Sequence, residues 1–232
     1  MWFVFDGMGS QWSGIGKDLL KYSIFADTIK RCYKSLPPDV NNLIIDGHSE
    51  LAENTNMVVD EIAAVCAVSI GLVELLKAVG MEPDGLIGHS LGELVLCYAD
   101  GALTLKQCLQ MAYWRIRCVI EADIPEGAMA TVGLPWEEVK VRCPKDVWPV
   151  CSNSLQNVTI SGTVSAVEKF VAELGQEKIF TKMVKSSGLP YHFPLMKPAV
   201  NEKTFSILNG IIKNPKPKSS SPSGSLREEQ GI

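Results

Sequence analysis

The sequence predicts an α/β fold in which a parallel sheet, with helices on its faces, carries a smaller inserted subdomain. Two observations support this prediction. Up to Pro125, short apolar runs alternate with longer runs of helical periodicity. After Pro125, the predicted order becomes strand, helix, strand, strand, helix, strand, which is the ferredoxin-like unit. The 232 residues suffice for one large domain with an insert of this kind.

The first part of the chain supplies two strands that should lie parallel. The apolar run 2–5 precedes a glycine-rich loop over 6–16, and the run 84–88 precedes a serine between two glycines. Helices are predicted within 17–36, over 57–79, from Leu91 onward and over 103–122. Because the carboxyl ends of parallel strands share one edge of a sheet, Met8 and Ser90 should meet there.

The second part supplies the inserted subdomain. Strands are predicted over 127–134, 147–154, 157–163 and 179–185, and helices over 135–143 and 164–176. We therefore expect an α/β core over 1–125 and 188–213, and a ferredoxin-like (βαββαβ) subdomain over 126–187. The Pro/Ser-rich run 214–232 is predicted to be a disordered tail.

Composition narrows the class of function. A net charge of −4 disfavours nucleic acid as the main partner. Seven cysteines without a C-x-x-C pair, together with only three histidines, disfavour a zinc site and indicate reduced thiols. No signal peptide is visible, and Glu74 and Lys77 interrupt the longest apolar stretch. We expect a cytoplasmic protein that does not span a membrane.

The segment Gly88–Gly92, GHSLG, fits the pattern G-x-S-x-G. This pattern is typical of a nucleophile elbow, in which a serine occupies a sharp turn between a strand and a helix. The glycines permit close packing in the turn, and the amides at the helix start point toward the serine. The alternative is a serine that caps the helix in a tight turn without any catalytic role.

A nucleophilic serine needs a base, which is usually a histidine from a remote segment. His89 adjoins Ser90, and its side chain should point away from the serine oxygen. His48 lies in a polar loop. His192 lies where the chain would return from the insert to the core, so it is the predicted base, with a purely structural histidine as the alternative.

An acyl-transfer site also needs backbone donors for an oxyanion. The amide of Leu91 is one candidate, and the amide of Met8, between two glycines, is the other. The alternative for this glycine-rich turn is that it binds no ligand. Arg115, on a mostly apolar helix, could pair with a substrate carboxylate, but the residues alone favour a surface arginine or a structural ion pair. Arg117 is interpreted as an ordinary solvent-facing charge.

Several motifs then occur in one order, and together they are far more specific than any one alone. They are WFVFDGMGSQW, PDGLIGHSLGEL, YADGALT, AYWRIRC, GAMATVGL, NVTISG and SSGLPYHFPLM. In this order the sequence resembles acyltransferase domains. The match is closest to the malonyl/acetyltransferase domain of animal type I fatty acid synthase, with polyketide synthase acyltransferases as relatives. The resemblance extends to about Lys218.

The resemblance implies an α/β-hydrolase-like core with a ferredoxin-like insert, and an active site in the cleft between them. It implies that Ser90 accepts malonyl, or also acetyl, from coenzyme A with His192 as base. The amides of Met8 and Leu91 would hold the oxyanion, and Arg115 would pair with the malonyl carboxylate. The acyl group would pass to the phosphopantetheine thiol of an acyl carrier protein within a larger, dimeric synthase. No metal and no tightly bound cofactor are implied.

Four departures from the family pattern bear on these expectations. Ser69 replaces a glutamine, Phe193 replaces a serine, and Tyr191 replaces a phenylalanine and adds a hydroxyl to the acyl pocket. The family chain also continues past this point, with a loop whose backbone carbonyls orient the histidine, so we expect a C-terminally truncated domain. The alternatives are a serine thioesterase or hydrolase, and an inactive fragment of a fatty acid or polyketide synthase.

Overall fold

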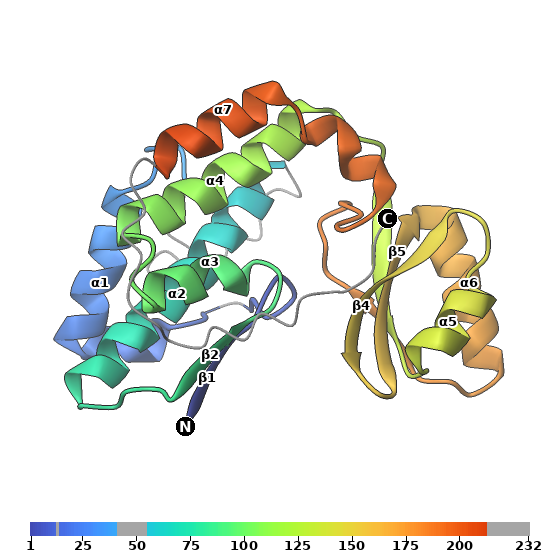
Figure 1. Ribbon diagram of the computed structural model, residues 1–232, viewed down its shortest axis with the longest axis horizontal. Coiled ribbons are helices and arrows are strands. Elements are labelled where there is room, and N and C mark those ends of the chain that lie inside the picture. The colour runs from blue at the N-terminus through green and yellow to red at the C-terminus, as the bar shows by residue number, and fades with distance from the viewer. Residues whose placement is uncertain (13, 41–54, 213–232) are drawn as a thin grey trace. The chain divides into compact units, whose positions relative to one another are not determined.

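A computed structural model describes residues 1–12, 14–40 and 55–212. The chain forms two compact units, Met1–Arg117 with Lys203–Ile232, and Cys118–Glu202 (Figure 1). The limits of the two units lie within fifteen residues of the boundaries predicted between the core and the subdomain. The predicted division into domains remains a proposal. The predicted tail over 214–232 and His48 lie outside the described residues.

The first unit contains the predicted parallel sheet. Strand β1 (Trp2–Phe5) pairs in parallel with β2 (Gly85–Gly88), in a register that runs from Trp2 opposite Gly85 to Phe5 opposite Gly88. The helices of this unit are the short 3₁₀ helix η1 (Lys17–Lys21), α1 (Ser23–Lys34), α2 (Thr55–Ala78), α3 (Gly92–Ala99), α4 (Leu105–Glu121) and α7 (Glu202–Ile211). Figure 1 shows α3 and α4 beside α2, with α7 along α4.

Apolar periodicity explains how these helices pack. Helix α1 buries Phe25, Ile29 and Cys32, which lie on one face because they are three to four residues apart. The ring of Phe25 reaches the backbone of α2 at Gly71, where any Cβ would overlap it. The helix predicted within 17–36 is divided at Tyr22, whose extended backbone (φ −91°, ψ 118°) separates η1 from α1.

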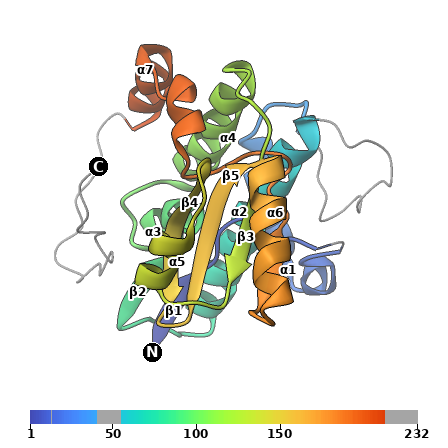
Figure 2. The ribbon, with the colours of Figure 1, turned by 90° about the vertical axis from the view of Figure 1, so that its right-hand side faces the viewer.

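The second unit is the predicted βαββαβ subdomain. Its elements are β3 (Gly127–Val132), α5 (Trp136–Arg142), β4 (Val147–Ser154), β5 (Asn157–Thr163), α6 (Val164–Gln176) and β6 (Thr181–Val184), followed by the 3₁₀ helix η2 (Pro194–Ala199). The sheet order is β4-β5-β3-β6, and every neighbouring pair is antiparallel. Helices α5 and α6 cover one face of this sheet (Figure 2). Ile160, Val139 and Phe170 belong to the core between them.

Candidate active site

The turn after β2 has the geometry of a nucleophile elbow. Ser90 has a φ of 53°, in the left-handed region that residues with a Cβ rarely adopt. The amide of His89 donates to the carbonyl of Phe5 at 3.0 Å, and the amide of Gly92 donates to the carbonyl of His89 at 2.9 Å. The strained serine is therefore held from both sides, between a strand and the first turn of α3.

Both glycines of the G-x-S-x-G motif are required by close backbone contacts. A Cβ on Gly88 would lie 2.7 Å from the backbone nitrogen of Glu93. A Cβ on Gly92 would overlap the carbonyl oxygen of Phe5. The motif thus packs the start of α3 directly against the ends of β2 and β1, which brings the helix amides to the serine.

The glycine-rich loop after β1 lies against this elbow, as the sequence predicts. A Cβ on Gly7 would lie 2.9 Å from the carbonyl oxygen of His89 and 3.2 Å from the Cβ of Ser90. Met8 follows Gly7 and is half-buried. In the described part of the chain, the amides of Met8 and Leu91 donate to no backbone carbonyl. Both predicted oxyanion donors therefore belong to segments that flank Ser90.

Two polar residues that the sequence interpretation did not single out fix the shape of this loop. The buried Gln11 accepts a hydrogen bond from the amide of Gly9 at 2.7 Å and donates to the carboxylate of Glu61 on α2 at 3.2 Å. The hydroxyl of Ser10 donates to the carbonyl of Gly7 at 2.9 Å. The sequence contained one indication of this contact, namely a glutamate within the apolar pattern of α2. A buried carboxylate needs a polar partner.

Arg115 lies on α4 with its side chain exposed, and Arg117 on the same helix is half-buried. Burial raises the pKa of the Cys66 thiol on α2 to about 12, and the positive charge of Arg115 acts to lower it. The guanidinium is therefore within electrostatic reach of α2. Ser69 is one helical turn from Cys66. Among the described residues, no ion pair to Arg115 is found.

His192 belongs to the second unit, in a loop that follows β6. The amide of Gly127 donates to the carbonyl of Gly188 at 2.9 Å, and a Cβ on Gly127 would overlap Pro190. The ring of Phe193 packs edge-on against Trp148 of β4, with centroids 6.0 Å apart. The sheet therefore anchors the loop on both sides of the histidine.

Within this anchored loop, His192 has a φ of 62° and an exposed side chain. Tyr191 is half-buried and Phe193 is buried. The two aromatic neighbours thus face protein while the imidazole faces outward. Ser90 belongs to the first unit and His192 to the second, so the pairing of these two side chains stays a prediction.

A family comparison decides what kind of domain these elements form. Residues 2–229 match the family model described as the acyl transferase domain. The chain belongs to this family. This acyl transferase domain is 34% identical over 199 residues to the polyketide synthase-like protein Preu9 of Preussia isomera. It is 34% identical over 201 residues to the highly reducing polyketide synthase srdA of Neurospora crassa. Each match covers 82% of the domain, but only 9% and 8% of the respective relative.

Solved structures show the same fold. The domain matches a loading acyltransferase of the avermectin modular polyketide synthase with a TM-score of 0.78 and 28% identity, over 89% of this chain and 67% of that one. It matches the malonyl CoA-acyl carrier protein transacylase of Coxiella burnetii with a TM-score of 0.75 and 26% identity, over 89% and 67% of the two chains. The predicted fold class is thereby confirmed. The chain thus has the fold of the acyltransferase domains of these two solved structures.

The described residues lack two kinds of feature. They contain no helix that is both long and apolar enough to cross a membrane. They also contain no group of three or more His, Cys, Asp or Glu side chains that could hold a metal ion.

Proposed function

We propose that this domain transfers malonyl, and also acetyl, from coenzyme A to the phosphopantetheine thiol of an acyl carrier protein. The observation that carries the proposal is Ser90 in its left-handed elbow, with the Met8 loop packed against it. The matched region is a small part of each large synthase, which supports a place for this domain in a larger synthase with a carrier protein as partner. That this synthase is dimeric is part of the same proposal. The resemblance to animal fatty acid synthase, a role in fatty acid biosynthesis and a cytoplasmic location are part of the same proposal.

In the first half-reaction, the oxygen of Ser90 attacks the thioester carbonyl while the imidazole of His192 accepts the serine proton. The amides of Met8 and Leu91 donate to the oxyanion of the tetrahedral intermediate. The carbon–sulfur bond then breaks, and coenzyme A leaves as a thiol with the proton from the imidazolium. The product is an acyl ester on Ser90.

In the second half-reaction, the phosphopantetheine thiol attacks this ester and gives its proton to His192. The bond to the serine oxygen breaks, and the serine regains a proton. Coenzyme A esters and the carrier-bound thiol are thus substrates, and no step needs a metal. Arg115 would bind the free carboxylate of malonyl, since the guanidinium has no ionic partner among the described residues.

Intact-protein mass spectrometry after brief mixing with malonyl-CoA tests this function. The wild-type chain should gain the mass of one malonyl group, and Ser90→Ala should gain none. Alanine keeps the Cβ and therefore the same backbone strain, so the two proteins differ only in the nucleophile. Circular dichroism establishes that both samples are folded.

The acceptor distinguishes transfer from hydrolysis. A transferase should move the label to added pantetheine faster than water removes it, whereas a thioesterase should lose the label equally fast without the thiol. A folded wild-type chain that never gains the label would contradict the proposal and identify an inactive fragment.

A further inference from the structure

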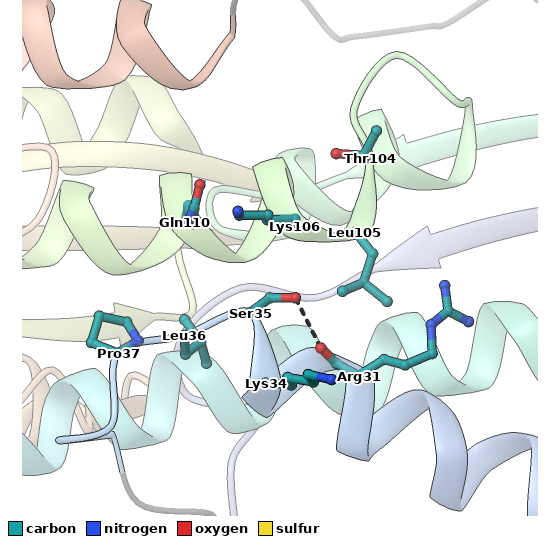
Figure 3. A pocket seen from close by; sticks show the side chains of 9 residues that line it. All are labelled: Arg31, Lys34, Ser35, Leu36, Pro37, Thr104, Leu105, Lys106 and Gln110. Carbon is teal, nitrogen blue, oxygen red and sulfur yellow. Dashed lines mark hydrogen bonds between the residues drawn. The ribbon is translucent and has the colours of Figure 1, made fainter.

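The first unit has a concave site that shares no residue with the candidate active site. A pocket of about 750 Å³ lies between two segments of the chain. One wall is the end of α1 together with the turn that follows it, and the other is the beginning of α4. Figure 3 shows the side chains of these two segments facing each other across the pocket. Its volume falls within the range of about 300–1,000 Å³ that is usual for small-molecule sites.

Every ionisable side chain that lines this pocket is a cation. These side chains are Arg31, Lys34 and Lys106, all exposed, in a chain whose net charge is −4. No ion pair to any of them is found in the described part of the chain. Lys30, also on α1, is instead paired with Asp27 at 3.1 Å. The positive charges of the pocket are therefore available for a ligand.

Glu74, a carboxylate whose charge acts on the pKa of Tyr98 in the direction opposite to that of Arg31, already has partners of its own. Burial and a hydrogen bond to Glu74 raise the pKa of Tyr98, while the charge of Arg31 acts to lower it. Glu74 accepts the hydroxyl of Tyr98 at 2.8 Å and pairs with Lys77 at 3.8 Å. Glu74 thus offers no free charge to neutralise Arg31.

The arrangement of the cations indicates a ligand with more than one anionic group. In Figure 3, Lys34 and Lys106 come from opposite walls, and the guanidinium of Arg31 extends away from both of them. Leu36 and Leu105 add apolar surface to the same lining. Helix α4 begins in this wall, so the positive end of its dipole adds to the charge.

We propose that this pocket binds a small molecule that carries two or more phosphate groups and an aromatic ring, as a nucleoside diphosphate does. Lysine ammonium groups bind phosphate oxygens as point charges, and an arginine can bind two oxygens at once. Three separated cations match a chain of phosphates better than a single anion. The apolar residues would contact the ring. This site does not depend on acyl transfer.

Isothermal titration calorimetry of the full chain with ADP tests the site. At low salt, ADP should bind the wild type, and the triple variant Arg31→Gln, Lys34→Gln, Lys106→Gln should bind it about tenfold or more weakly. The matched control is Lys30→Gln, Lys140→Gln, Lys169→Gln, which removes the same charge from exposed positions outside the pocket. The control should bind ADP as the wild type does.

Three outcomes would overturn the proposal. The wild type could fail to bind ADP at millimolar concentration. The pocket variant could bind ADP as tightly as the matched control, which would place the phosphates elsewhere. A hexaglutamate peptide could bind more tightly than ADP and lose its binding in the pocket variant, which would identify a site for an acidic polypeptide.

Discussion

At Ser90 and at the glycines beside it, single backbone positions determine the geometry of the site. Gly92 has no room for a methyl group, because the carbonyl of Phe5 occupies that space. Gly175, in α6, has nothing within 4 Å of the position of its Cβ. Substitution by alanine at these two glycines should therefore have opposite effects on the free energy of unfolding.

Gly92→Ala should lower the free energy of unfolding by about 2–3 kcal/mol, because β1 and α3 must move apart. Gly175→Ala should raise it by about 0.5–1 kcal/mol, because alanine lowers the entropy of the unfolded chain and favours the helix. Urea titrations followed by circular dichroism measure both changes. Equal stabilities of the two variants would contradict the packing described at the elbow.

Arg115 supports a prediction about substrate choice. Arg115→Ala should lower kcat/KM for malonyl-CoA by about a hundredfold, since the malonyl carboxylate would lose its charged partner. The value for acetyl-CoA should change little, because acetyl has no carboxylate. For malonyl-CoA, the kcat/KM of Arg115→Lys should lie between those of the wild type and Arg115→Ala. Lysine keeps the positive charge but cannot bind both carboxylate oxygens in the geometry of a guanidinium. An equal loss for both substrates would show a structural role for Arg115.

At the scale of helices and strands, apolar periodicity predicted most of the fold. The strand 2–5 and the helix 164–176 have the predicted limits, because their patterns end at glycine-rich or polar residues. The break at Tyr22 was missed, because nothing in the local pattern interrupts the helix there. The Gln11–Glu61 contact could not be predicted, since it joins residues 50 positions apart.

The packing of α1, α2 and α4 makes stability depend on pH. Burial raises the pKa of Cys32 and of Cys66 to about 12, from 9.0, and also raises that of Cys108. These thiols stay protonated in the folded state while the unfolded chain loses their protons. Their contribution to stability is therefore complete below pH 9.0 and is lost as the pH rises toward about 12.

Above pH 9.0, the free energy of unfolding should thus fall by about 1.4 kcal/mol per pH unit for each such thiol. Cys66→Val removes one thiol while keeping an apolar side chain, so its slope should be shallower than that of the wild type. Urea titrations at several pH values give the two slopes. Parallel slopes would mean that Cys66 is not protected from ionisation by burial.

For the whole molecule, the two units have separate sheets, and the second has a core of its own around Ile160. Ile160→Ala should lower the stability of this unit by about 2–5 kcal/mol, because it leaves a cavity in a fully buried position. Hydrogen exchange should show faster exchange in β3 and β5 and little change in α2. An equal loss of protection in α2 would show that the two units unfold as one.

The left-handed turn at Ser90 also has an evolutionary consequence. Glycine adopts this backbone without the cost of about 1 kcal/mol or more that a Cβ incurs there. Ser90→Gly should therefore yield a more stable protein that lacks the proposed nucleophile. A library of variants selected for heat resistance alone should therefore be enriched in this inactive variant. Serine at this position is retained only if selection for activity outweighs the gain in stability.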